Sequence, residues 1–177
     1  MIAYHGSPVL FDRFDAGKIG SVNDRGANGY GIYLTDHRGI AESYAAPKWK
    51  GPDYAKGFLY EVEVPDGEYL SCDWLCVDQP EPVRSVLLDG IDRLAGPRAG
   101  YWKFVINDAP QMTRYYSQIG RLLHFSRLNG TPLEPDLAAC GYVGCKKWRE
   151  DWGVWEFVVF DPSDLRILSV AEHERAN

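Results

Sequence analysis

The sequence lacks three features that would place it in common protein classes: a membrane-length apolar run, a secretion signal and a concentration of positive charge. No stretch approaches 18 consecutive apolar residues, so no transmembrane helix and no membrane partner are expected. A basic segment followed by an apolar one is missing from the first residues, which predicts a cytoplasmic protein. Delivery into a target cell stays open. The 19 Lys and Arg residues are scattered among 25 Asp and Glu residues, which disfavours nucleic acid as the main partner.

Cysteine is scarce and poorly spaced for a metal. The four cysteines, Cys72, Cys76, Cys140 and Cys145, form C-x3-C and C-x4-C pairs with no histidine beside them. Zinc knuckles use other spacings. We therefore expect buried free thiols and no metal site.

The 177 residues suit a single domain, 1–177, with a real core. No internal repeat is present. Turn-bounded apolar runs predict strands, and the 3.6-residue period predicts helices that come as a block between strands, which is typical of an α+β fold. The expected strands are Ile2–His5, Gly31–Thr35, Phe58–Val64, Gly141–Trp148 and Val154–Phe160; the expected helices are Asp36–Ala46, Glu81–Leu94, Thr113–Leu128 and Leu133–Gly141; Pro97–Pro110 is expected to be a long connection.

Glu156 stands alone among apolar residues on the last strong strand, "VWEFVVF". Both faces of that strand are apolar, so we expect it to be covered on both sides. Glutamate is almost never fully buried without a partner. Three readings follow: a carboxylate at the mouth of a cleft, a structural ion pair with an arginine, or a strand that faces solvent at that point.

Two tyrosines can converge in "GYGIYLTDHRGIAESYA" (Gly29–Ala45). Tyr33 lies on a strand face opposite Ile32 and Leu34, and Tyr44 lies on the following helix beside small residues. The gap between them would fit a flat ring. The alternative is that both tyrosines fill core space. His5 is a third polar residue in an apolar context. It ends the first apolar strand and precedes a glycine, where a ligand could approach the bare backbone.

These motifs together resemble the ADP-ribosyltransferase superfamily in its His-Tyr-Glu branch, which includes poly(ADP-ribose) polymerases and diphtheria toxin. "YHGS" is similar to the first-strand motif of that branch, Gly29–Ala45 to its tyrosine strand and helix, and "WEFVVFDPSDLRIL" to its glutamate strand. "FDRFDAGKIG" and "LYEVEVPDGEYL" resemble small bacterial and phage transferase domains of polyvalent proteins. The resemblance implies an ADP-ribosyltransferase-like split β-sheet core with flanking helices.

The same resemblance implies roles for individual residues around NAD, which would be consumed as a substrate. Glu156 would bind the 2'-hydroxyl of the nicotinamide ribose, and Tyr33 and Tyr44 would enclose the nicotinamide ring. Backbone groups of Gly6 would hold the carboxamide, and His5, with help from Ser7, would hold the adenosine-side ribose. Lys18 and Arg25 are candidates for binding the pyrophosphate. Catalysis would rest on Glu156, His5 and Tyr33.

The expected function is therefore mono-ADP-ribosyl transfer, a glycosyltransferase reaction, by a toxin, effector or phage-type modifier with an antitoxin or immunity protein as a further partner. The alternatives are an NAD glycohydrolase, an enzyme that modifies RNA or DNA, and a catalytically silent NAD-binding module. Arginine-modifying relatives resemble one another in an acidic residue two positions before the glutamate, where this chain has Val154. We therefore expect a protein acceptor other than arginine, because the acidic chain would also repel a phosphate backbone.

Overall fold

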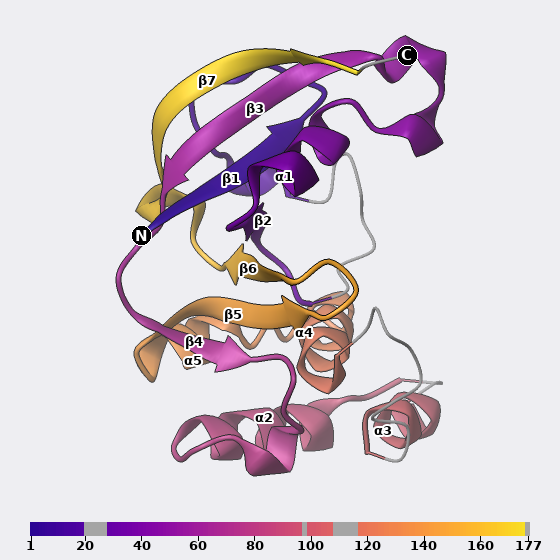
Figure 1. The fold of residues 1–177 in the computed structure, drawn as a ribbon. Helices are drawn as coiled ribbons and strands as arrows, with labels where there is room; N and C mark the ends of the chain where they lie inside the picture. Colours follow the sequence, from indigo (N-terminus) through magenta and orange to yellow (C-terminus); the bar gives the residue numbers. More distant parts are fainter. Residues whose placement is uncertain (20–27, 97–98, 108–116, 176–177) are drawn as a thin grey trace.

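The computed structural model describes residues 1–19, 28–96, 99–107 and 117–175. They form one mixed sheet of seven strands, which confirms the α+β class (Figure 1). The strand order is β4-β5-β6-β2-β1-β3-β7, and every neighbouring pair is antiparallel except β4–β5. The strands are β1 (Ile2–Ser7), β2 (Ile32–Thr35), β3 (Lys56–Glu63), β4 (Glu68–Ser71), β5 (Tyr142–Arg149), β6 (Val154–Val159) and β7 (Arg166–Glu174).

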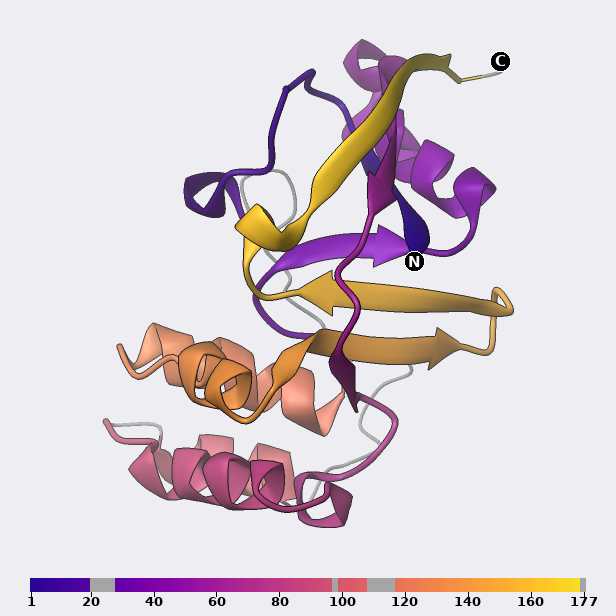
Figure 2. The same cartoon turned by 90° about the vertical axis from the view of Figure 1, so that its left-hand side faces the viewer.

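Five α-helices accompany the sheet in the described ranges: α1 (Arg38–Ala45), α2 (Val83–Arg93), α3 (Ala99–Asn107), α4 (Gln118–Leu128) and α5 (Glu134–Ala139). Figures 1 and 2 show α2, α4 and α5 gathered at the β4–β5 end of the sheet, whereas α1 lies beside β1. The sheet therefore has a helix-rich end and an end made mainly of β1, β3 and β7.

Two hydrophobic clusters occupy opposite faces of β6. Val158 joins the cluster built with α2, α4 and α5, while Phe157 and Val159 join the cluster built with β1, β2 and β3. Alternating side chains of one strand thus enter both cores, which confirms that β6 is covered on both sides. Three of the cysteines, Cys72, Cys76 and Cys145, are buried free thiols in the helical cluster, and Cys140 is half-buried.

Most predicted elements appear within a few residues of their expected bounds. The helix expected over Thr113–Leu128 begins at Gln118, because the side chain of Ser117 accepts a hydrogen bond from Gly120 N and caps it; residues 113–116 lie outside the described part. The expected connection Pro97–Pro110 is wrong, since Ala99–Asn107 is helical. Strands β4 and β7 were not predicted.

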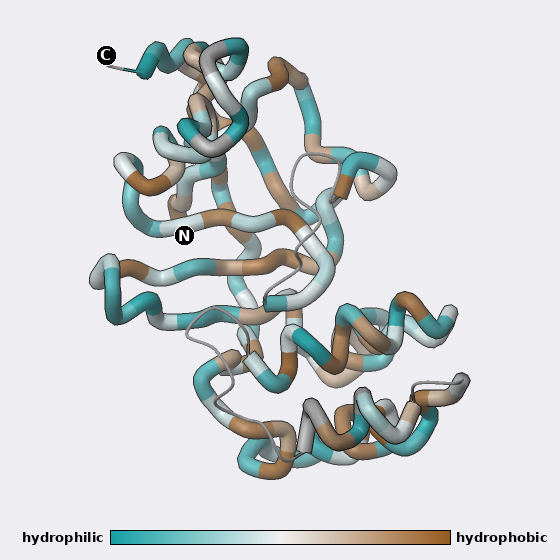
Figure 3. The backbone as a smooth tube through the Cα atoms, turned by 90° about the vertical axis from the view of Figure 1, so that its right-hand side faces the viewer, coloured by the Kyte–Doolittle hydropathy of each residue, from teal (hydrophilic) through white to brown (hydrophobic). Residues whose placement is uncertain are grey.

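Hydrophobic and hydrophilic residues are interspersed along the strands and helices of the chain (Figure 3). Among the described residues, no helix combines the length and apolar character needed to cross a membrane. Most of the buried apolar residues lie in the two clusters on the faces of the sheet.

Strands β1 and β2 are paired over the shortest length of any two neighbouring strands in the sheet. That ladder contains one residue pair, Tyr4 opposite Thr35, whereas β1 and β3 pair over six residues. Helix α1 covers β1 and β3 closely at this point: a Cβ on Gly6 would collide with backbone atoms of Ala41 and Ala45, and one on Gly57 with the carbonyl of Ala45. Glycine is required at both positions because helix and strand backbones touch there.

Candidate active site

Three adjacent strands carry the three residues on which the sequence hypothesis depends. His5 lies on β1, Tyr33 on β2 and Glu156 on β6, and β2 stands between the other two strands. Glu156 is directly opposite Thr35 and Tyr33 is opposite Val158, so Glu156 and Tyr33 share one face of the sheet. Glu156 and Tyr33, which are far apart in sequence, thus lie on the same face of two adjacent strands at the middle of the sheet.

Glu156 is buried and held from two sides. Its residue surface is 8% exposed. Oε1 accepts a hydrogen bond from Arg149 Nη1 at 3.0 Å, and Oε2 accepts one from Asn28 Nδ2 at 3.1 Å. The arginine ion pair considered from the sequence is therefore present. It leaves further acceptor capacity on the carboxylate, since each ionised oxygen has two lone pairs.

Arg149 is the centre of a charged cluster at the end of β5. Its Nε and Nη2 donate to Oδ1 and Oδ2 of Asp151, both at 3.3 Å, while Nη1 donates to Glu156. The guanidinium carbon lies 4.1 Å from the centroid of the Trp152 ring. Burial alone would lower the pKa of Arg149, but the carboxylates of Glu156 and Asp151 outweigh it and raise that pKa. The guanidinium therefore stays charged beside Glu156.

Asn28 connects Glu156 to the tyrosine strand. Its backbone N–H donates to Tyr33 Oη at 3.0 Å, and its side chain donates to Glu156. The carbonyl of Asn28 accepts a weak hydrogen bond from Cys72 Sγ at 3.8 Å. Its Oδ1 is buried and has no hydrogen-bond partner among the described residues, which is uncommon for a buried polar atom.

Tyr33 and Tyr44 lie in the electrostatic field of Glu156. Tyr33 Oη donates to the carbonyl of Gly29 at 2.8 Å, and the ring packs against the helical cluster. Burial raises the pKa of both tyrosines, and the carboxylate of Glu156 raises both further. The alternative that Tyr33 fills core space thus applies to its ring, which packs at the edge of the helical cluster. Its hydroxyl, by contrast, forms hydrogen bonds with the backbone of Asn28 and Gly29.

Where β1 and β2 separate and no longer pair through their backbones, the side chain of His5 forms a hydrogen bond to the backbone of β2. Its Nδ1 lies 2.8 Å from the carbonyl oxygen of Tyr33, so Nδ1 carries the proton and donates it. Burial lowers the pKa of His5, and the hydrogen bond to Tyr33 opposes this only in part. The imidazole is therefore neutral, with Nε2 as an acceptor. The ring makes edge contacts with Phe11 and Phe14, on the face of the sheet opposite Glu156.

The remaining predicted residues are placed less distinctively. Gly6 lies against the backbone of α1, as described above, and Ser7 Oγ accepts a hydrogen bond from Val9 N at 3.1 Å. Lys18 is exposed at the end of the 3-10 turn Ala16–Lys18. Arg25 lies outside the described residues. Sequence reasoning missed Asn28 and Arg149, the two residues that hold Glu156.

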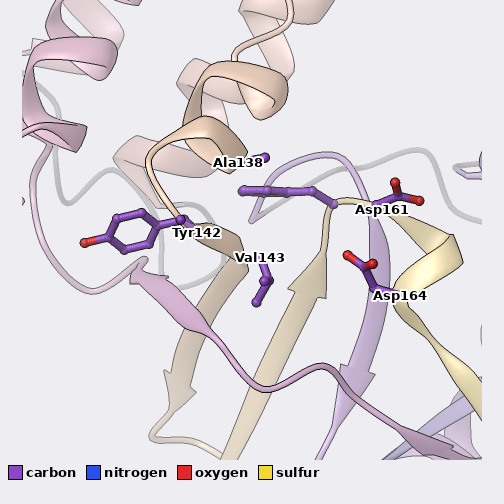
Figure 4. A pocket seen from close by; sticks show the side chains of 7 residues that line it. Ala138, Tyr142, Val143, Asp161 and Asp164 are labelled. Carbon is purple, nitrogen blue, oxygen red and sulfur yellow. The ribbon is translucent and has the colours of Figure 1, made fainter.

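A cavity of about 250 Å³ lies at the other end of β6 from Glu156. Figure 4 shows its walls, with the carboxylates of Asp161 and Asp164 beside Val143 and the end of α5. Asp161 already caps the following turn, because its Oδ1 accepts hydrogen bonds from the backbone N–H and the hydroxyl of Ser163, which lower its pKa. None of His5, Tyr33 and Glu156 lines this cavity, so it is separate from the site on the middle strands.

The site offers hydrogen-bonding groups and charge rather than metal ligands. Within the described ranges, no three His, Cys, Asp or Glu side chains lie close enough together to hold a metal ion. The chain was compared with protein-family models, with curated proteins and with solved structures, and none of the three comparisons found a match.

Proposed function

We propose that this chain is a mono-ADP-ribosyltransferase that transfers ADP-ribose from NAD to a macromolecule. One observation carries the proposal: Glu156 and Tyr33 come from distant parts of the chain and lie on one face of adjacent strands, with Glu156 held by an ion pair in a buried position. A buried carboxylate beside tyrosines whose pKa is raised is typical of functional sites.

The chemistry required is the cleavage of the bond between the nicotinamide nitrogen and C1' of ribose. Nicotinamide leaves with the bonding electron pair, C1' gains oxocarbenium character, and an acceptor atom then bonds to C1' and loses its proton. Glu156 is suited to stabilising the positive charge, because a fixed carboxylate in a water-poor site needs no reorganisation during the reaction. Tyr33 and Tyr44, both near that carboxylate, would orient the leaving ring.

His5 and Asn28 supply the remaining polar groups. With Nδ1 bound to the Tyr33 carbonyl, Nε2 of His5 presents a lone pair suited to a hydroxyl donor on the face of the sheet opposite Glu156. The buried Oδ1 of Asn28, which has no partner within the described part of the chain, is suited to a donor such as an amide or hydroxyl group. NAD carries amide and hydroxyl donors, so the acceptor on Asn28 beside Glu156 is compatible with NAD as the substrate.

Two features support an acceptor other than arginine. The position that would carry a second acid, Val154, is buried at 2% exposure and stands opposite Arg149 in the hairpin. Asp151 is the acid that comes close to Glu156 through a shared partner, and Arg149 already binds both of its oxygens. An incoming guanidinium would have to compete with an internal one.

The test is incubation of the purified chain with labelled NAD and cell lysate, alongside a Glu156→Gln variant as the inactive control. Label transferred to protein, on residues other than arginine by mass spectrometry, supports the proposal. Free ADP-ribose without labelled macromolecule would assign a glycohydrolase instead, label on nucleic acid would overturn the protein acceptor, and no consumption of NAD would overturn the enzyme.

A further inference from the structure

We infer that Arg149 is a positioning residue that fixes the carboxylate of Glu156 for the reaction by bridging it to Asp151. This inference rests on the proposed function and extends it to a residue that contacts neither the reacting sugar nor the leaving group. The inferred role of Arg149 is to act through Glu156, which its side chain binds directly.

The bridge spans the turn of the β5–β6 hairpin. Arg149 is the last residue of β5, its carbonyl accepts hydrogen bonds from Trp152 N and Gly153 N, and its side chain reaches forward to Glu156 on β6. The guanidinium thus joins the turn, through Asp151, to the strand that carries Glu156. A flat guanidinium fork can bind two carboxylates in fixed directions, which an ammonium cannot do.

The second contact to Glu156 comes from another part of the sheet. Asn28 binds Oε2 from the segment before β2, while Arg149 binds Oε1 from β5. The two oxygens are thereby held by different segments of the chain, the end of β5 and the turn before β2, which leaves the carboxylate little freedom to rotate. Because Arg149 is only 8% exposed and its guanidinium lies over the Trp152 ring, the guanidinium is shielded from water, while Asp151 lies at the exposed turn.

Loss of such a bridge should reduce turnover more than substrate binding. A displacement of about 1 Å in a catalytic group can cost on the order of 10²-fold in rate. Arg149→Ala should therefore lower kcat for NAD cleavage by about that factor with little change in KM. Arg149→Lys keeps the charge but makes a single contact, so its kcat should lie between those of the other two forms.

The decisive measurement is chemical rescue. Guanidinium chloride at low millimolar concentration should enter the space left in Arg149→Ala, bind between Asp151 and Glu156, and restore much of the lost kcat. Sodium chloride at the same ionic strength should not. Arg166→Ala is the matched control, because it removes an arginine from an exposed ion pair with Glu63 on β3, away from the site. Guanidinium should change neither this control nor the wild type.

Thermal unfolding with guanidinium gives a second readout that needs no turnover. Binding to the folded variant should raise the midpoint of Arg149→Ala but not that of the wild type. If the wild type cleaves NAD and Arg149→Ala keeps its kcat, or loses it without rescue and without a midpoint shift, the inference is overturned. If Arg149→Ala does not fold, an unchanged kcat in Arg149→Lys overturns it. A wild type that does not cleave NAD refutes the proposed function and this role with it, and the midpoint shift then reports only whether the guanidinium slot exists.

Discussion

Replacing Glu156 by glutamine removes its charge while keeping its shape. Arg149 can still donate to the amide oxygen and keeps both of its hydrogen bonds to Asp151. The new amide group would face the amide of Asn28, but Asn28 can turn over, because its Oδ1 has no partner among the described residues and can accept the new donor. The variant should therefore fold.

The expected loss of stability is that of one hydrogen bond to a charged group, about 1.5–3 kcal/mol. Glu156→Ala should cost more, about 3–5 kcal/mol, because it removes one partner of a buried ion pair. The turnover of Glu156→Gln should fall by about 10²–10³, which corresponds to about 2.7–4 kcal/mol of transition-state stabilisation. Its affinity for NAD should change little.

The assay is nicotinamide release at saturating NAD, with calorimetric binding and thermal unfolding measured on the same protein. Phe157→Leu, a conservative change at the next position on the opposite face of β6, serves as a control for general disturbance of the strand. A folded Glu156→Gln protein that turns over NAD as fast as the wild type would refute the assignment of Glu156.

Three further predictions concern the neighbouring residues. Tyr44→Ala should weaken NAD binding by about 1–2 kcal/mol while Tyr44→Phe retains most of it, measured by calorimetry, and unchanged binding in Tyr44→Ala would exclude ring stacking there. Tyr33→Phe should lower the free energy of unfolding by about 1–3 kcal/mol in chemical denaturation, because the buried N–H of Asn28 loses its acceptor and the carbonyl of Gly29 its donor. Burial lowers the pKa of His5 below its ordinary value of 6.5, so its contribution to stability is present above pH 6.5 and is lost as the pH falls from there through the lowered pKa. His5→Gln should therefore show a smaller loss of stability than the wild type between pH 7 and pH 5, and identical pH profiles would contradict the assignment.

The elements that sequence reasoning predicted correctly are those with a strong local pattern. Strand β6 is apolar on both faces, and α1 follows a turn. The hydrophobic period and the turn residues were therefore enough to predict both elements. Strand β7 was missed because most of its residues are exposed and polar, and its pairing with β3 is a long-range property. Helix α3 was missed because the flanking prolines suggested a loop, although its residues are largely apolar apart from Lys103 and Asn107.

The candidate site shows the same division. His5, Tyr33 and Glu156 stand out locally because each is a polar residue in an apolar strand. Asn28 does not stand out, because it lies 128 positions before the carboxylate that it binds, and no local sequence pattern indicates a contact between residues so far apart in the chain. Arg149 was within reach: an arginine seven residues before a buried glutamate, across a turn, is the spacing of a hairpin contact.

The close packing of Gly6 and Gly57 on α1 decides which parts of the site can move together. Because no side chain separates these glycines from the helix, α1 packs directly on β1 and β3, and we expect Tyr44 on α1 to move together with His5 on β1. Tyr33 and Glu156 lie on the paired strands β2 and β6, and we expect these two residues to move together. The two groups are joined across the sheet by the pair Tyr4–Thr35 and the hydrogen bond from His5, and outside it by the short link from β2 to α1, where His37 N donates to Thr35 Oγ1. A ligand that contacts both groups would restrict their motion relative to each other. Amide hydrogen exchange in β1 and β2 should therefore slow on binding, even at residues that the ligand does not contact.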